Sequence, residues 1–326
     1  MGDLVRRPIG TADCKDWARL LAAVEPVDGT GENYDADDLV EELADPNIDP
    51  ARDSLGLWLD GTMIGYGLAR GGQDLVDGGY RVAVEGTVHP DHRRRGYGRP
   101  IVDWSLARAA QIAAERHPGV PALASTRSSS TNTGEHAMLE PLGFERSRWF
   151  FQMHRPVADP PPVQVPDGLR LVPYDRAYDE QTRLAHNEAF ADHWGSAPST
   201  PSSWGHWSVG QRAFRPALSY QVLDTAAAGE PADPVVGYLL SYEYEADTAA
   251  TGIREAYVGL LGTRRAWRGR GVGRAMLAHA VTAFRDAGFA RTSLDVDADS
   301  PTGALGLYTS LGFQKSRTSI NFTRPL

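Results

Sequence analysis

Cysteine and long apolar runs are the clearest absences from this sequence. Cys14 is the only cysteine, so the chain cannot form an internal disulfide, and no motif surrounds it that would mark a nucleophile. No segment combines the length and apolarity of a secretory leader or a membrane-spanning helix. These absences predict a cytoplasmic protein with no membrane partner.

Positive charge is also scarce. The 326 residues include 33 Lys and Arg against 42 Asp and Glu, which gives a formal net charge of −9. The longest basic stretch is Arg93–Arg95. Because an acidic protein repels the phosphate backbone of nucleic acid, we expect no nucleic-acid partner.

One motif is present twice. Leu-Gly-Phe occurs at residues 142–144 and 311–313, and a loop of the form Arg-x-x-Gly-x-Gly precedes each copy, at residues 93–98 and 268–273. A repeat of so long a period corresponds to a whole domain. A chain of this length also has room for two hydrophobic cores.

A proline-rich segment separates the two copies. Residues 156–166 contain too much proline for a helix or a central strand and are typical of a semi-extended linker. We therefore predict a first domain over residues 1–155, a linker over 156–167 and a second domain over 168–326. Strand-like and helix-like apolar patterns alternate in each half, which predicts an α+β fold.

Each glycine-rich loop follows a strand-like run and begins a helix. After the second loop, Met276, Ala280 and Phe284 recur at helical spacing until Gly288 ends the pattern. Glycines at such a junction let backbone N–H groups converge on an anion, which the helix N-terminus also attracts. The loops therefore predict a ligand that carries phosphate.

Spacing separates these loops from two common phosphate-binding motifs. Neither copy has the Gly-Lys-Ser/Thr of a P-loop, and Arg274 stands where the dinucleotide fingerprint requires a third glycine. An Arg-x-x-Gly-x-Gly loop after a strand, followed by Tyr308 and Leu-Gly-Phe, resembles the GCN5-related N-acetyltransferase (GNAT) superfamily. The tandem arrangement resembles mycothiol synthase, which pairs a C-terminal catalytic domain with a degenerate N-terminal one.

The resemblance implies a fold and a cosubstrate. It implies two tandem GNAT-type domains, each a mixed, largely antiparallel sheet flanked by helices, with a wedge for acetyl-CoA between splayed strands. The pantetheine is expected on the strand before the loop and the pyrophosphate on the loop amides. The expected contacts in the second domain are Leu261, Gly262, Thr263, Arg268, Gly269, Arg270, Gly271, Val272, Gly273 and Arg274. Those in the first domain are Gly86, Thr87, Val88, Arg93, Arg94, Arg95, Gly96, Tyr97 and Gly98.

Acetyl transfer to an amine needs a base and an acid. The amine, whose pKa is about 10 when free, must be neutral to attack, and the departing thiolate benefits from a proton donor. Tyr308 matches the family's acid, four residues before the glycine of Leu-Gly-Phe. The family's base position falls on Tyr257, so we expect Glu255, on the same strand face, to act through one water. A solvated strand-end carboxylate is the alternative for Glu255.

The first domain lacks these groups. Leu139 occupies its acid position and Val82 its base position. Its loop glycines remain, which predicts a degenerate or regulatory domain that holds CoA without turnover. Glu85 is a candidate hydrogen-bond partner for such a ligand.

These observations predict an N-acetyltransferase that acts on the primary amine of a small molecule, without a metal, as a monomer or homodimer. Glu188 and Asp192 are candidate contacts for the acceptor ammonium group, and solvated helix acids are the alternative. Tyr257 is assigned to the acceptor site, and Asp295, Asp297 and Asp299 to a cation-attracting rim or a solvated face. Two further hypotheses are an aminoglycoside-like antibiotic self-resistance enzyme and a non-catalytic acyl-CoA sensor, although a sensor has no use for Tyr308.

Overall fold

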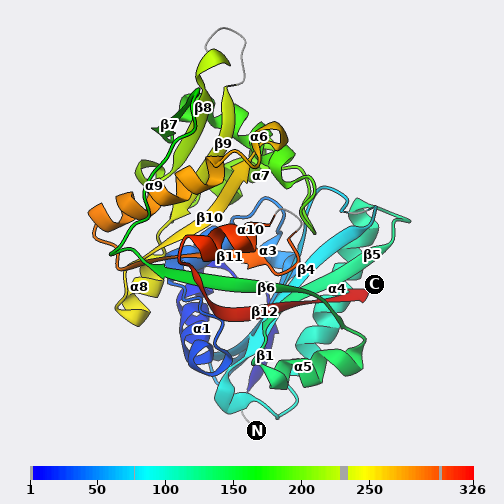
Figure 1. Cartoon of the computed structure of the whole chain (residues 1–326). Coiled ribbons are helices and arrows are strands. Elements are labelled where there is room, and N and C mark those ends of the chain that lie inside the picture. The colour runs from blue at the N-terminus through cyan, green and yellow to red at the C-terminus, as the bar shows by residue number, and fades with distance from the viewer. Residues whose placement is uncertain (1–2, 77, 228–233, 301–302) are drawn as a thin grey trace. The chain divides into compact units, whose positions relative to one another are not determined.

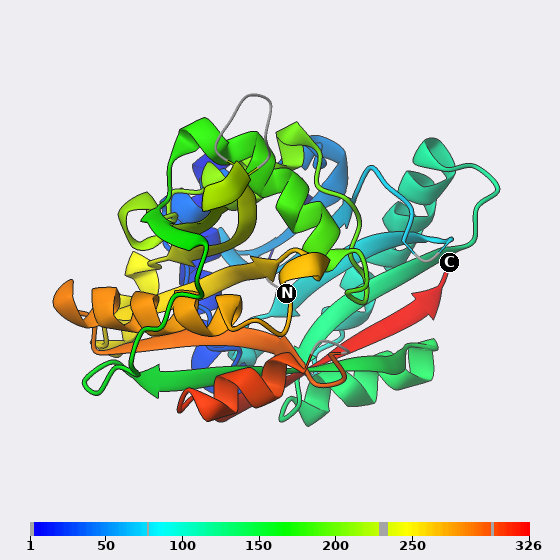
Figure 2. The ribbon, with the colours of Figure 1, turned by 45° about the horizontal axis from the view of Figure 1, so that its top comes forward.

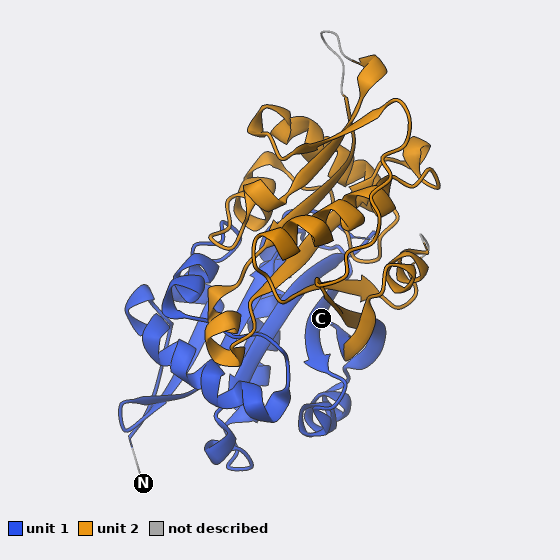
Figure 3. Ribbon diagram, turned by 60° about the vertical axis from the view of Figure 1, so that its left-hand side comes forward, with its two compact units in different colours: residues 1–150, 318–326 blue, residues 151–317 orange. Residues whose placement is uncertain are grey.

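The chain folds into two compact units, which Figure 3 shows in different colours. The structure is a computed structural model, and it describes residues 3–76, 78–227, 234–300 and 303–326. Unit 1 comprises residues 1–150 and 318–326, and unit 2 comprises residues 151–317. Each unit is an α+β fold built on its own set of neighbouring strands, as the repeat predicts.

Unit 1 contains the first eleven of the main elements along the chain (Figure 1). Short 3-10 turns at Thr11–Asp13, Pro90–His92 and Glu140–Leu142 accompany them. The helices and strands are β1 (Leu4–Arg7), α1 (Cys14–Asp28), α2 (Ala36–Leu43), α3 (Pro50–Asp53), β2 (Ser54–Leu59), β3 (Thr62–Gly71), β4 (Tyr80–Val88), α4 (Gly98–Arg116), β5 (Ala122–Ser129), α5 (Thr133–Leu139) and β6 (Glu145–Pro156), of which residues 151–156 belong to unit 2.

Unit 2 repeats this order with small variations. One-turn elements at Arg176–Tyr178, Gly205–Val209, Pro216–Leu218, Thr225–Ala227 and Arg265–Trp267 join its main elements. The helices and strands are β7 (Leu169–Pro173), α6 (Asp179–Phe190), α7 (Pro201–Trp204), β8 (Tyr220–Asp224), β9 (Val235–Tyr242), α8 (Glu245–Thr251), β10 (Glu255–Thr263), α9 (Val272–Asp286), β11 (Arg291–Asp297), α10 (Ala304–Ser310) and β12 (Gln314–Pro325), of which residues 318–325 belong to unit 1.

The strands of the two units follow the same plan. In unit 1 the order is β1-β2-β3-β4-β5, and in unit 2 it is β7-β8-β9-β10-β11. The pairs β4–β5 and β10–β11 are parallel, whereas β1–β2, β2–β3, β3–β4, β7–β8, β8–β9 and β9–β10 are antiparallel. The prediction of mixed, largely antiparallel sheets flanked by helices is confirmed.

The end of the chain returns to unit 1. Residues 319–325 of β12 pair antiparallel with residues 123–129 of β5. The sequence predicts one domain over residues 168–326, whereas the structure places 318–326 in unit 1. The physical reason is the free edge of β5, whose N–H and C=O groups need a strand partner. An end-of-chain strand has no local signal that reveals which of two similar sheets it joins.

The sheet of unit 2 carries helices on both faces. On one face α9 lies along the strands, as its orange helix shows in Figure 2. The expected helical stripe is buried there, because Met276, Ala280 and Phe284 are all fully inaccessible. On the other face α6 and α7 pack against β9 through Ala185, Trp204 and Tyr238. We name the two sides of the sheet the α9 face and the α6 face, after these helices.

Unit 1 is arranged in the same way. One face of its sheet packs on α4 through Ile101, Ala109 and Ile112, and the other packs on α1 and α2 through Trp17 and Leu39. A hairpin at Asp60-Gly61 joins β2 to β3, with φ of 50° and 80° at the two residues. Positive φ at both positions is what a tight hairpin turn requires.

Replacing Phe322 tests where the last strand belongs. This side chain is fully buried in the unit 1 core. The centroid of its ring lies 5.1 Å from that of His136. Phe322→Ala should lower the free energy of unfolding by about 3–5 kcal/mol through the cavity it leaves. Hydrogen exchange should speed up in β5 and α5, while the half-buried neighbour Thr323→Ala should have little effect. Faster exchange confined to β10 and β11 would contradict the assignment.

Candidate active site

The centre of unit 2 is the point where two parallel strands separate. β10 and β11 pair over Glu255↔Arg291, Ala256↔Thr292 and Tyr257↔Ser293, and no further pairs follow. β10 instead continues beside β9 as far as Thr263. Among the described residues, no strand pairs with this edge of β10 from Val258 onward, so its backbone groups can pair with an extended ligand.

A bulge in β10 lies directly after the separation. The register with β9 shifts between Val258 and Leu260, so Gly259 is the extra residue. A Cβ at Gly259 would lie 2.5 Å from the ring of Tyr242 and 3.3 Å from that of Tyr257, which explains the glycine. Tyr257, predicted for the acceptor site, therefore lies with Tyr242 and Tyr244 on the α6 face, with ring centroids 6.5 and 6.0 Å away.

A second glycine on β10 is covered by a tyrosine. A Cβ at Gly262 would lie 2.3 Å from the ring of Tyr238, so that phenol packs directly on the strand predicted to hold pantetheine. His186 of α6 holds the Tyr238 hydroxyl at 2.6 Å, and burial lowers the pKa of His186 to about 4. The imidazole is therefore neutral, and the pair fixes this side of β10.

The glycine loop has the conformation that a phosphate site needs. Gly269 and Gly271 have φ of 72° and 85°, in the left-handed region, and α9 begins at Val272. A Cβ at Gly273 would make only an ordinary contact, 3.5 Å from Leu307, so protein packing does not require glycine there. The first amides of α9 lack intrahelical partners, which suits them to an anion.

The loop arginines differ in their contacts. Arg268 turns back to the protein and donates to the carbonyls of Ala189 at 2.7 Å and Thr263 at 3.3 Å, so it anchors the loop to α6. Arg270 lies 5.0 Å over the ring of Trp267, and Arg274 donates to Ser310 of α10 at 2.9 Å. Of the three arginines, Arg268 is thus the one whose side chain is directed to backbone carbonyls of the protein.

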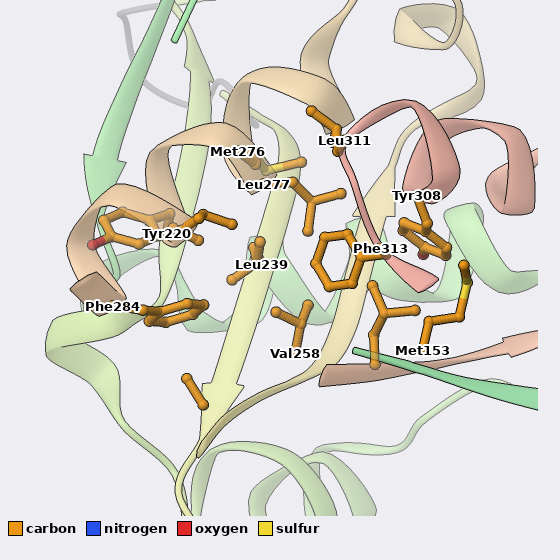
Figure 4. Packing of buried hydrophobic residues seen from close by; sticks show 14 of the residues in the cluster. Met153, Tyr220, Leu239, Val258, Met276, Leu277, Phe284, Tyr308, Leu311 and Phe313 are labelled. Atoms are coloured by element: carbon orange, nitrogen blue, oxygen red, sulfur yellow. The ribbon is translucent and has the colours of Figure 1, made fainter. Parts of the chain in front are cut away.

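Tyr308 is buried on the α9 face. Figure 4 shows it among packed side chains that include Met153 and Phe313, and it shares a core with Val258 of β10 and Leu294 of β11. Burial raises the pKa of Tyr308 to about 12. The phenol is therefore fully protonated at neutral pH, as a proton donor must be.

Glu255 is held by a network at the separation point. Its Oε1 accepts a hydrogen bond of 2.5 Å from Ser293, the last paired residue of β11. Its Oε2 accepts from Arg291 and lies 3.7 Å from Nε2 of His154 on β6. The sequence does not reveal His154, Arg291 or Ser293 as neighbours of Glu255, because His154 lies about a hundred residues upstream in the chain.

The predicted ammonium contacts on α6 are already paired. Glu188 binds Arg264 at 2.7 Å and the amide of Arg265 at 2.9 Å, and Asp192 binds Arg265 at 2.6 Å. An acceptor ammonium group would have to displace these arginines. Of the predicted acidic rim on β11, Asp297 is buried and accepts from the amide of Asp299 at 3.0 Å.

Unit 1 has a similar but altered cleft. β4 and β5 pair from Tyr80 to Ala83 and then separate, and β3 pairs with β4 from Gly65 to Gly71 without a register shift. The predicted CoA residues Gly86, Thr87 and Val88 lie within that regular pairing. Arg94, with φ of 60°, replaces the glycine found at position 269.

The loop of unit 1 is also tied to the protein. Arg93 donates to both carboxylate oxygens of Asp28 at 2.7 and 2.8 Å and to the carbonyl of Val88 at 2.9 Å. Gly96 has φ of 87°, and α4 begins at Gly98, where a Cβ would lie 3.2 Å from the sulfur of Met138. Arg95 and Tyr97 belong to the same short loop.

Leu139 is buried at the acid position of unit 1, one helical turn after Glu135. Burial raises the pKa of Glu135 to about 7, against the opposing effect of a 2.5 Å hydrogen bond from Ser128. This carboxyl is a titratable group that the motif comparison misses, because the motif marks only the Leu139 position.

Similarity to known proteins decides the family. The model of the acetyltransferase (GNAT) family matches residues 16–144 and again 182–313. The chain belongs to the GNAT family. It is therefore an acyltransferase, and the family uses acetyl-CoA as its acyl donor, which the phosphate-type loop and the open edge of β10 fit.

The GNAT relatives include proteins with the same tandem arrangement. The chain is 28% identical to a mycothiol acetyltransferase of Parafrankia sp. over 98% of this chain and 97% of the relative. It is 30% identical to a mycothiol acetyltransferase of Salinispora arenicola, over 95% of this chain and 92% of the relative. A GCN5-related N-acetyltransferase from Sphaerobacter thermophilus has the same fold, with a TM-score of 0.75, 24% identity and coverage of 99% and 95%. A tandem GNAT protein from the clavulanic acid biosynthesis pathway also has this fold, with a TM-score of 0.70 and 19% identity. The match covers 99% of this chain and 98% of that protein.

Within residues 3–76, 78–227, 234–300 and 303–326, no group of three His, Cys, Asp or Glu side chains is placed to bind a metal ion. In the same ranges, no helix has both the length and the apolar character to cross a membrane.

Changing the loop glycines tests the acetyl-CoA site of unit 2. The double variant Gly271→Val, Gly273→Val should weaken acetyl-CoA binding at least about tenfold, because position 271 requires φ near 85° and a branched side chain at 273 blocks the approach of phosphate. Calorimetric titration of the full chain measures this. Gly205→Val is the control, since a Cβ there meets open space. Unchanged affinity in the double variant would contradict the site.

Proposed function

We propose that unit 2 transfers the acetyl group of acetyl-CoA to the primary amine of a small molecule, by direct attack of the amine on the thioester. The observation that carries the proposal is the separation of β10 and β11 beside a glycine loop and the buried phenol of Tyr308. The open edge of β10 would bind the pantetheine amides, and the loop and the first turn of α9 would bind the pyrophosphate.

In this proposal Tyr308 is the acid. Acetyl transfer breaks the C–S bond, and the departing thiolate, whose pKa is about 8.5 in a simple thiol, is stabilised by a hydrogen-bond donor. Because the pKa of Tyr308 is raised to about 12, its O–H group is present throughout the neutral range. Glu255, predicted as the base, would have to act while bound to Arg291 and Ser293.

The relatives support a small acceptor. Mycothiol acetyltransferases are similar to this chain over nearly their whole length, so we assign the acceptor to the class of small-molecule amine that such enzymes acetylate. An aminoglycoside-like acceptor is less well supported. Such a polycation needs free carboxylates, whereas Glu188 and Asp192 are bound to arginines.

We assign the sensor-like role to unit 1. Leu139 provides no proton at the acid position, and the regular β3–β4 pairing lacks the bulge present in unit 2. Unit 1 would then bind CoA through its loop and α4 without turning it over.

Tyr308→Phe should lower turnover about 10- to 1,000-fold and leave acetyl-CoA affinity nearly unchanged, because only the hydroxyl is lost. Thiol release across a panel of amines measures the rate. The phenol stays protonated below its pKa of about 12, so the wild-type rate should show no fall from its ionisation up to about pH 10. Tyr220→Phe, in the same core, is the control. Wild-type turnover in Tyr308→Phe would contradict the acid role.

Loop changes in unit 1 separate the roles of the two units. Gly96→Val with Gly98→Val should remove any CoA binding by unit 1, because Gly96 has φ of 87° and the Cβ of residue 98 meets Met138. Turnover should fall less than about threefold, since unit 2 performs the chemistry. If this variant abolished turnover while Tyr308→Phe retained it, the active unit would be unit 1.

A further inference from the structure

The carboxylate of Glu255 lies at the apex of the separation between β10 and β11. Glu255 begins β10, yet its side chain reaches forward to Ser293, which is paired with Tyr257 at the last rung before the strands part. Tyr257 belongs to the α6 face, and side chains two residues apart on a strand share a face. Glu255 therefore lies on the α6 face, opposite the α9 face that contains Tyr308.

Glu255 is poorly suited to accept a proton itself. Ser293 donates to one of its oxygens and Arg291 to the other. An incoming amine or water would have to displace one of these donors to reach a carboxylate oxygen. A base at this position must be another group.

His154 is the neighbour that can accept a proton. Its Nε2 lies 3.7 Å from Oε2 of Glu255. The His154 side chain is 21% exposed, so solvent can still reach the ring. The gap is too long for a direct hydrogen bond and leaves Nε2 able to bind a water or an amine. Burial lowers the pKa of His154 below its ordinary value, so the ring is neutral at neutral pH.

The charged groups around His154 come from three other strands. Glu255 of β10 opposes the effect of burial and raises the pKa of His154, whereas Arg291 of β11 and Arg317 of β12 lower it further. The charge of Glu255 thus stabilises the imidazolium that forms on proton uptake, whereas the charges of Arg291 and Arg317 favour the neutral ring. Such a ring takes up a proton and releases it again readily.

We propose that His154 is the proton acceptor of unit 2 and that Glu255 is a positioning residue that stabilises the protonated ring. This rests on the acetyl transfer proposed above. The amine nitrogen forms a bond to the acetyl carbon and the C–S bond breaks. The proton of the amine passes to Nε2, directly or through one water, and the sulfur receives the proton of Tyr308. Solvent then carries the proton of the imidazolium to the tyrosinate, so both groups return to their starting forms.

Proton NMR of the histidine rings tests the pairing without any acceptor. The His154 signal, identified by its loss in His154→Gln, should titrate below 6.5, the ordinary value for histidine. Glu255→Gln should move this titration to lower pH, and Arg317→Gln should move it to higher pH. An unchanged midpoint in Glu255→Gln would overturn the pairing.

Kinetics test the catalytic role. Below the pKa of His154, log kcat/KM should rise with a slope of two, because both His154 and the amine must lose a proton; above it the slope should be one. His154→Gln should remove this break and lower kcat/KM about 100-fold or more, while acetyl-CoA affinity stays normal. His279→Gln, a half-buried histidine on the α9 face, should keep the break.

The outcomes separate this inference from the proposed function. An unchanged break and rate in His154→Gln, with a slow Tyr308→Phe, would overturn the role of His154 and leave acetyl transfer in unit 2 intact. Wild-type rates in both variants would overturn the proposed function itself.

Discussion

The early separation of β10 from β11 is the constraint on which the site of unit 2 depends. Two parallel strands part after three residue pairs, so in the described part of the chain one edge of β10 has no strand partner beyond Tyr257, and a ligand with amide groups can pair with it. The bulge at Gly259 and the loop at Gly271 matter because they lie along this one strand and its continuation.

The charges around the separation are mostly balanced by the protein itself. Glu188, Asp192 and Glu255 each pair with an arginine, and Arg268 binds backbone carbonyls of Ala189 and Thr263. These pairs fix α6, β10 and β11 to the loop, so their contribution is geometric. Because amides at a helix N-terminus can bind an anion, the proposed cosubstrate site does not require an excess of basic side chains in this acidic chain.

The repeated motif was enough to predict the fold, because its glycines and its helical apolar stripe are local features. Gly271, Met276 and Phe284 each adopt the conformation or burial that their spacing predicts. The pairing of residues 319–325 with β5 was not predictable, since no local signal in that strand reveals its partner.

The site was only partly predictable from sequence. Tyr308 follows from a motif, and the structure gives it the burial that keeps it protonated. The partners of Glu255 and Glu188 depend on which strands and helices come together, and neither His154 nor Arg264 stands in a motif. Glu135 was missed for the same reason, because burial rather than sequence spacing sets its pKa.

Hydrogen exchange with and without acetyl-CoA tests the central claim most directly, because the claim assigns binding to particular backbone amides. The account predicts slower exchange at residues 259–263 and 271–274 of unit 2 when acetyl-CoA is bound, with the amides of α8 unchanged. Protection confined to residues 86–88 and 93–98 of unit 1, with none along β10 or at the start of α9, would contradict it.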